Sequence, residues 1–353
     1  MIRMTWLQFR TQAAVAVSGL VILAAVLALT GPNLLHLYDT VVATCAAHGD
    51  CSTASSSFLK NDRSLQIGLD ALVVIVPGVI GLFWGPPLVA REFETSTFRL
   101  AWTQSVTRRR WLAVKLGVIG LASVAVAGLV SLAVTWWSSP VDRVNMTAFT
   151  SFDQRDVVSI GYAAFAFALG VTAGLLIRRI VPAMAIALSV FVAVRLSFTH
   201  WVRPHLLGPI HRFVALNLTT VGFGSYSSSG PATLKPIAPT IPNGWIYSTQ
   251  IIGNDGHALS AQYVARVCPS LVQSVGGSTP SPSGIGAKAQ VPESALQALQ
   301  ACATKVGKTY RELVTYQPGS HFWPLQWYEL GIYLVVALIL AAICVWWVRR
   351  LAA

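Results

Sequence analysis

The segment from residue 91 to residue 115 carries the most distinctive group of polar side chains in the chain. Two acids, Glu92 and Glu94, follow one apolar stretch, and Lys115 lies inside the next. The Ser and Thr residues between them are typical caps of short helices. A short amphipathic helix at a membrane surface can dock into a soluble partner. The alternative is an ordinary basic loop between two spans, and the residue types alone leave both open.

Nucleotide or metal chemistry finds little support in the sequence. A phosphate-binding loop needs G-x-x-x-x-G-K-[ST], but the Gly-Lys-Thr at 307–309 has Cys302 in place of the first glycine. Three histidines, His200, His205 and His211, have prolines between them that prevent regular ligand spacing on one helix. We therefore expect no metal and no cofactor in this chain.

Charged residues inside the apolar stretches are few and lie near the ends of those stretches. Asp70, Arg195 and Glu329 lie near one side and Lys115 near the other. Such charges reach the interface at low cost, so they argue against the ion pathway of a secondary transporter. A pair between Asp70 and Arg195 would be structural.

Phe83 and Trp84 precede a Gly-Pro-Pro sequence that interrupts an apolar stretch. A proline break at this point can form a kink or a helix end. The two aromatic side chains are candidates for lining a substrate path. The alternative is that they belong to the aromatic belt at the membrane interface.

The composition places all these residues on a membrane protein. Of 353 residues, 54% are hydrophobic and 11% are charged, against roughly 25% charged in soluble domains. Stretches long enough to cross a bilayer must satisfy their backbone internally, so we expect α-helices. The six predicted spans are residues 12–30, 65–88, 112–137, 157–177, 180–198 and 326–347. The predicted fold class is thus an all-α membrane protein.

The distribution of basic residues predicts the orientation. If both termini are cytoplasmic, the inner side holds 12 of the 25 Lys and Arg but only two of the 13 acids. Residues 1–11 are predicted to form an amphipathic helix in the inner interface. No soluble basic module with stacking aromatics is apparent, so nucleic acid is not an expected partner.

The spans divide the chain into four parts. After the interfacial helix, residues 12–198 form transmembrane helices 1 to 5, with a cytoplasmic loop at 91–110. A mixed, loop-rich extracellular insert covers 199–325, and residues 326–353 form the sixth helix and a cytoplasmic C-terminus. Four cysteines fall outside the spans, and an oxidising exterior favours two disulfides, although alternative pairings remain open. The two expected disulfides are Cys45–Cys51 and Cys268–Cys302.

The loop resembles the first intracellular loop of permease subunits of type-2 ABC transporters. That loop reads E-x-E-x-G-T, then an apolar short helix, a Ser/Thr-Arg turn and a Lys in the next span. Matching residues are Glu92, Glu94, Thr97, Arg108 and Lys115, whereas Ser96 replaces the usual Gly. The flanking sequence is similar to an actinobacterial branch of these permeases.

The resemblance implies a half-transporter in a bacterial plasma membrane. Two copies would form a homodimer, each resting on a separate ABC ATPase subunit that binds ATP and Mg²⁺. A coupling helix near residues 94–105 would dock into the ATPase, with Leu100 and Trp102 on its apolar face. The chain would be a non-enzymatic exporter permease. Because the spans offer almost no buried charge to neutralise an ion, we expect an amphipathic or apolar substrate. The competing interpretation is a non-transporting immunity or sensor protein whose extracellular insert binds a ligand.

Overall fold

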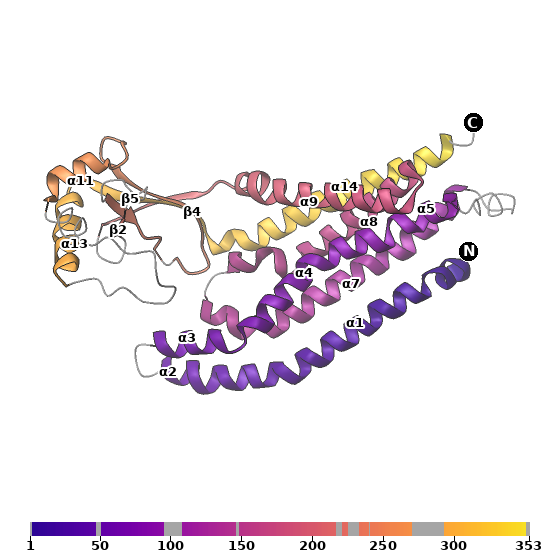
Figure 1. Cartoon of the computed structure of the whole chain (residues 1–353), viewed down its shortest axis with the longest axis horizontal. Coiled ribbons are helices and arrows are strands. Elements are labelled where there is room, and N and C mark those ends of the chain that lie inside the picture. The colour runs from indigo at the N-terminus through magenta and orange to yellow at the C-terminus, as the bar shows by residue number, and fades with distance from the viewer. Residues whose placement is uncertain are drawn as a thin grey trace. The chain divides into compact units, whose positions relative to one another are not determined.

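A computed structural model describes most of the chain as two compact units. The described residues are 2–46, 51–94, 108–145, 148–216, 221–224, 233–239, 241–269 and 293–350. The membrane unit comprises Met1–Leu207 and Ser320–Ala353, and the insert unit comprises Gly208–Gly319. The labels of both are given in Figure 1.

The membrane unit confirms the predicted all-α fold. Within the described ranges, six helices are long and apolar enough to cross a membrane. They are built on α1 (Ile2–Leu37), α4 (Arg63–Trp84), α7 (Arg108–Asn145), α8 (Val158–Ile177), α9 (Ile180–Ser197) and α14 (Phe322–Arg350). Helix α1 is continuous, so residues 2–11 form its first turns rather than a separate helix. Their position in the membrane interface stays a prediction.

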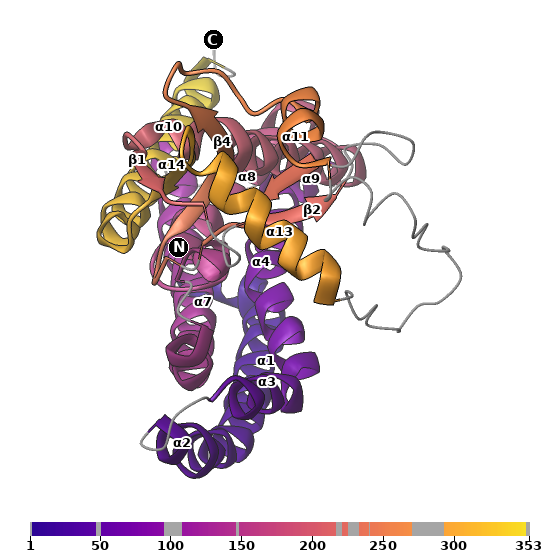
Figure 2. The same ribbon diagram turned by 90° about the vertical axis from the view of Figure 1, so that its left-hand side faces the viewer.

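Helix α8 is the centre of the membrane unit and packs against α4, α7, α9 and α14. Small residues allow this close packing. A Cβ atom at Gly170 would lie 2.4 Å from the carbonyl oxygen of Gly81, so a larger residue would force α4 away from α8. Figures 1 and 2 show α1 at one edge of the unit, beside α7 and on the opposite side from α9 and α14.

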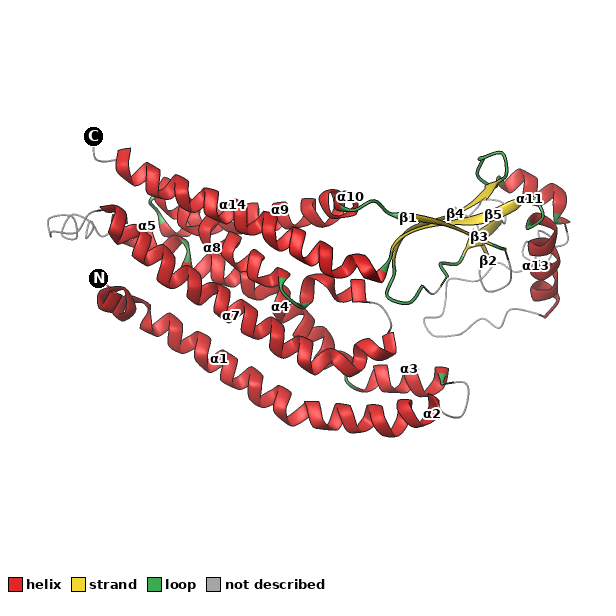
Figure 3. Ribbon diagram, turned by 180° about the vertical axis from the view of Figure 1, so that it is seen from behind, coloured by secondary structure: helices red, strands yellow, loops and turns green. Residues whose placement is uncertain are grey.

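Two short segments extend the spans. Helix α4 ends at Trp84, and α5 (Pro86–Glu94) follows after Gly85, because a proline cannot donate the backbone hydrogen bond that would continue α4. Helix α9 is extended by η3 (Phe198–Val202) and α10 (Arg203–Leu206). Figure 3 shows α10 at the end of the membrane unit opposite to α5, the start of α1 and the end of α14.

The connections between spans are also largely helical. Between α1 and α4 lie η1 (Tyr38–Ala43), α2 (Thr44–Ala46) and α3 (Ser52–Asn61). The predicted disulfide between Cys45 and Cys51 closes this connection. Segment η2 (Ala148–Gln154) leads into α8, and η4 (Gly319–His321) precedes α14.

The insert unit contains all the described strands, as Figure 3 shows. One antiparallel sheet has the order β1 (Ile210–Val214), β5 (Tyr310–Gln317), β4 (Trp245–Gly253). A second antiparallel pair is β2 (Val221–Gly224) with β3 (Thr233–Pro236). Helices α11 (Ala261–Val267) and α13 (Glu293–Val306) complete the unit.

The insert unit has its own apolar core and its own cross-link. Val264 of α11, Leu299 of α13 and Ile251 of β4 are buried together in one cluster. The second predicted disulfide, Cys268–Cys302, joins the end of α11 to α13. The unit is shorter than the predicted insert 199–325, because the chain stays helical through η3 and α10 after the fifth span.

Candidate functional site

The segment predicted to contact an ATPase begins at the end of α5 and finishes at the start of α7. Glu92 lies near the end of α5, and its Oε1 forms an ion pair with Nζ of Lys115 on α7. The Lys115 side chain is only 4% exposed, and its ammonium lies 4.6 Å from the centre of the Trp111 ring. This pair joins the two helices from which the segment extends.

Glu94, the last residue of α5, is tied to a third helix. Its Oε1 accepts a hydrogen bond of 2.9 Å from the backbone N–H of Ile180, where α9 begins. The first N–H groups of a helix have no partner within the helix, and a carboxylate is favourable at that end. The two acids therefore connect α5 to α7 and to α9.

The structure covers only part of the predicted coupling segment. Arg108 is the first residue of α7, and Lys115 follows two turns later. The remaining predicted contact residues lie outside the described ranges: Thr97, Leu100 and Trp102.

The two aromatic residues proposed for a substrate path lie in different surroundings. Trp84 is buried, and its ring packs edge-on against Phe9 of α1, with 4.8 Å between ring centroids. Phe83 is half exposed, and its carbonyl oxygen accepts a 3.0 Å hydrogen bond from Nε2 of Gln12. Trp84 thus packs α4 onto α1. Neither residue lines the pocket described below.

A buried polar cluster occupies the other end of the membrane unit. We call it the Arg203 cluster, and it consists of Asp153 of η2, Tyr162 of α8, Arg203 of α10 and Glu329 of α14. Arg203 donates from Nε to Glu329 Oε2 at 2.9 Å and from Nη2 to Oε1 at 3.0 Å. It also donates from Nη1 to Asp153 Oδ2 at 3.2 Å. The Tyr162 hydroxyl lies 3.0 Å from Asp153 Oδ1.

Neighbouring contacts fix this cluster. The buried amide of Gln326 on α14 accepts the Val158 N–H at 3.0 Å and donates to the Phe152 carbonyl at 2.9 Å. These bonds hold η2 and the start of α8 against α14. Burial raises the pKa of the Asp153 carboxyl, but Arg203 and Arg195 outweigh burial and hold that pKa below its usual range. Asp153 is therefore a stable carboxylate.

The possible pair between Asp70 and Arg195 does not form. The Nη2 of Arg195 lies 3.6 Å from Asp153 Oδ1, whereas the charged neighbour of Asp70 is Arg155. The sequence interpretation missed Asp153 and Arg203 because both fall outside the predicted spans. Their positions, a few residues from span ends on one side of the membrane, were the signal that could have identified them.

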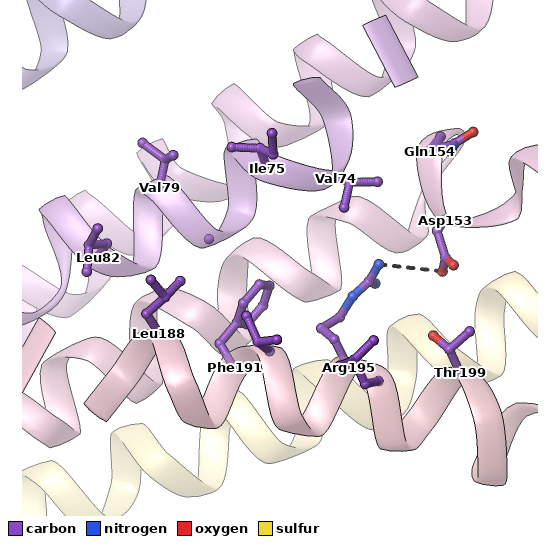
Figure 4. Close-up of a pocket in the computed structure, with 13 residues that line it drawn as sticks. Val74, Ile75, Val79, Leu82, Asp153, Gln154, Leu188, Phe191, Arg195 and Thr199 are labelled. Atoms are coloured by element: carbon purple, nitrogen blue, oxygen red, sulfur yellow. Dashed lines mark ion pairs between the residues drawn. The ribbon is translucent and has the colours of Figure 1, made fainter. Parts of the chain in front are cut away.

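A pocket of about 540 Å³ lies between α4 and α9. Figure 4 shows its labelled apolar lining, with Val79 and Leu82 on α4 facing Leu188 and Phe191 on α9. The polar lining residues gather at one end: Asp153, Gln154, Arg195 and Thr199. An apolar wall with a few polar groups at one end is typical of small-molecule sites.

The comparison with known families agrees with this architecture. A family model described as ABC-2 membrane transporter related matches residues 17–203. This match covers more than half of the chain, from within α1 to the start of α10, and includes the polar residues that pair with Arg203 from η2 and α8. Neither a curated protein nor a solved structure matches the chain significantly. The chain belongs to the ABC-2 membrane transporter related family.

Proposed function

We propose that this chain is the membrane-spanning permease subunit of an ABC exporter. Permeases of the ABC-2 type generally work with an ATPase subunit. Two copies of the chain pair in a bacterial plasma membrane, and each rests on a separate ATPase that binds ATP and Mg²⁺. Both termini are cytoplasmic, and the chain belongs to an actinobacterial branch of these permeases.

The double connection of α5 supports coupling to a partner. Glu92 ties α5 to α7, and Glu94 ties it to the start of α9. A partner that displaces the segment between residues 94 and 108 would therefore move α7 and α9 together. Because α9 forms one wall of the pocket, that movement would change the pocket, as in other transitions driven by helix shifts.

The pocket supports the kind of cargo. Its walls are apolar over most of their length, and its charged lining residues are confined to one end. An amphipathic or apolar molecule fits such walls better than a hydrated ion. Outward transport is inferred by analogy with the permeases of type-2 ABC transporters, which the 91–115 loop resembles.

The test is co-purification of the tagged full chain from native membranes. We expect a P-loop ATPase to co-purify and vanadate-sensitive ATP hydrolysis to accompany it. Deleting residues 95–105 should abolish both without preventing membrane insertion. Lys115→Met, which breaks the tie between α5 and α7, should lower hydrolysis several-fold, whereas the exposed control Lys308→Met should leave it unchanged.

The second candidate is a sensor or immunity protein, and the compact insert unit with its own core and disulfide favours it. This candidate predicts that the chain purifies without an ATPase and shows no hydrolysis. That result would contradict the permease proposal and would direct ligand screens to the insert unit.

A further inference from the structure

The pocket between α4 and α9 has the dimensions of a site for one extended chain. Its lining on α4 runs from Val74 to Leu82, which is about 12 Å of helix rise. Its volume of about 540 Å³ is within the usual range for small-ligand sites. The pocket is open along one side, because Ile75 is 57% and Leu196 is 56% exposed.

The acid at the polar end of the pocket is already engaged. Both oxygens of Asp153 accept hydrogen bonds from Arg203, and the Tyr162 hydroxyl lies 3.0 Å from one of them. Glu329 accepts from Nε and Nη2 of Arg203, so two carboxylates share this guanidinium, and Arg195 is the second cation beside Asp153. Asp153 therefore has little remaining capacity to bind a ligand cation.

Arg195 has donors to spare. An arginine has five N–H donors and no acceptor. The guanidinium carbon of Arg195 lies 3.4 Å from the centre of the Tyr162 ring, and its only ion pair, among the described residues, is the 3.6 Å contact of Nη2 with Asp153. Within the same described part of the chain, Nη1 is buried without a hydrogen-bond partner. Figure 4 shows the side chain reaching from α9 toward Val74 and Asp153.

A buried donor without a partner is costly, and a ligand acceptor would remove that cost. Phosphate, sulfate and carboxylate groups match the planar donor array of arginine. The stacking on Tyr162 holds the guanidinium in place at the polar end of the pocket. The polar end of the pocket therefore favours an anion over a cation.

We propose that the pocket binds a single-chain amphiphile with an anionic head group. The apolar chain lies between α4 and α9, and Arg195 binds the head group. The inference rests on the proposed function, since it assigns this class of molecule as the cargo. The two acyl chains of a phospholipid have roughly twice the volume of the single chain of such an amphiphile and do not match a pocket of this size.

The test measures binding to the full chain alone in nanodiscs of zwitterionic lipid. Equilibrium dialysis with radiolabelled dodecyl phosphate or dodecyltrimethylammonium gives the two affinities, with empty nanodiscs subtracted. We expect dodecyl phosphate to bind about 10-fold tighter or more, as for one charged hydrogen bond. Because no ATPase is present, the outcome of this binding experiment does not depend on whether an ATPase co-purifies with the chain.

The variants assign the site. Arg195→Gln should remove the preference for dodecyl phosphate, and Arg195→Lys, which keeps the charge, should retain part of it. Val192→Trp, which fills the pocket without changing charge, should weaken both probes. The control Arg212→Gln changes an exposed arginine of the insert unit and should behave as the unmodified chain.

Three outcomes would overturn the proposal. The first is equal binding of the two probes by the unmodified chain. The second is a phosphate preference that survives in Arg195→Gln, or binding that Val192→Trp leaves unchanged. The third is a two-chain phospholipid that occupies the pocket. Native mass spectrometry would show it bound to the unmodified chain, even with dodecyl phosphate present, and absent from Val192→Trp.

Discussion

Two glutamates, one in each unit, are completely buried but differ in their surroundings. Glu329 on α14 and Glu312 on β5 are both 0% exposed. Both oxygens of Glu329 accept hydrogen bonds from Arg203. Neither oxygen of Glu312 has a hydrogen-bond partner within the described residues. The same residue type is therefore buried with a countercharge in the membrane unit and without one in the insert unit.

The missing countercharge affects the protonation of Glu312. An ionised carboxylate is expensive to bury without a partner, and burial raises the pKa of Glu312 to about 7. Glu312 lies in the central strand, directly opposite Val214 on one side and Ile251 on the other. The insert unit thus carries a carboxyl that loses its proton near neutral pH, whereas both carboxyl groups of the Arg203 cluster have a guanidinium partner.

The largest effect is expected from breaking the Arg203 cluster. Glu329→Gln leaves the guanidinium of Arg203 buried with one carboxylate instead of two. Removing one partner of a buried ion pair costs about 3–5 kcal/mol. We expect a loss of that size in the free energy of unfolding of the membrane unit, measured by denaturant titration in detergent.

The matched control for this change is Asp39→Asn, which neutralises an exposed acid in the same unit. It should change the free energy of unfolding by less than about 0.5 kcal/mol. Equal stability of Glu329→Gln and Asp39→Asn would show that the cluster contributes specificity or function rather than stability.

The two disulfides provide the next largest effect and again separate the units. Removing Cys268–Cys302 by a double Ser substitution opens a connection of 34 residues and should cost about 3–4 kcal/mol. Hydrogen exchange should rise in β4, β5 and α13 of the insert unit. The six spans should keep their protection.

The comparison disulfide is Cys45–Cys51, which spans only 6 residues. Its removal should cost about 2 kcal/mol in the chain-entropy description, with faster exchange confined to η1, α2 and α3. If removing Cys268–Cys302 also increased exchange in α8, the two units would be coupled more tightly than their separate cores indicate.

The sequence predicts the six spans well because hydrophobic length is a local property of each segment. Both disulfides could also be inferred, since four cysteines fall outside the spans in two neighbouring pairs. The Arg203–Glu329 pair joins residues 126 apart in sequence, and only the packing of α10 against α14 brings them together. The position of Glu312 likewise depends on the pairing of β5 with β1, two strands whose patterns are too short to predict that register.

The contacts of the coupling segment could be predicted from the sequence only in part. The motif identified Glu92, Glu94 and Lys115 as a group, but not which helices they connect. The hydrogen bond from Ile180 to Glu94 follows from the position of α9 beside α5. Spacing along one segment carries no information about a helix that begins 86 residues later.

The smallest effect tests the unpaired carboxyl of the insert unit. The pKa of Glu312 is about 7 in the folded chain, above the usual value of 4.5. The folded state therefore binds more protons than the unfolded state between these values, and stability falls as pH rises through that range. Glu312→Gln, which stays neutral, should match the stability of the unmodified chain at about pH 4 and exceed it at about pH 8.

The measurement is hydrogen exchange of β5 in the full chain, comparing variant and unmodified protein at the same pH. Slower exchange in Glu312→Gln at the higher pH is the expected result, because the variant has no carboxylate to desolvate. Arg311→Gln, which changes an exposed neighbour on the same strand, controls for a general effect of charge. If Glu312→Gln instead exchanged faster at the higher pH, Glu312 would have to be ionised and stabilised in the folded chain.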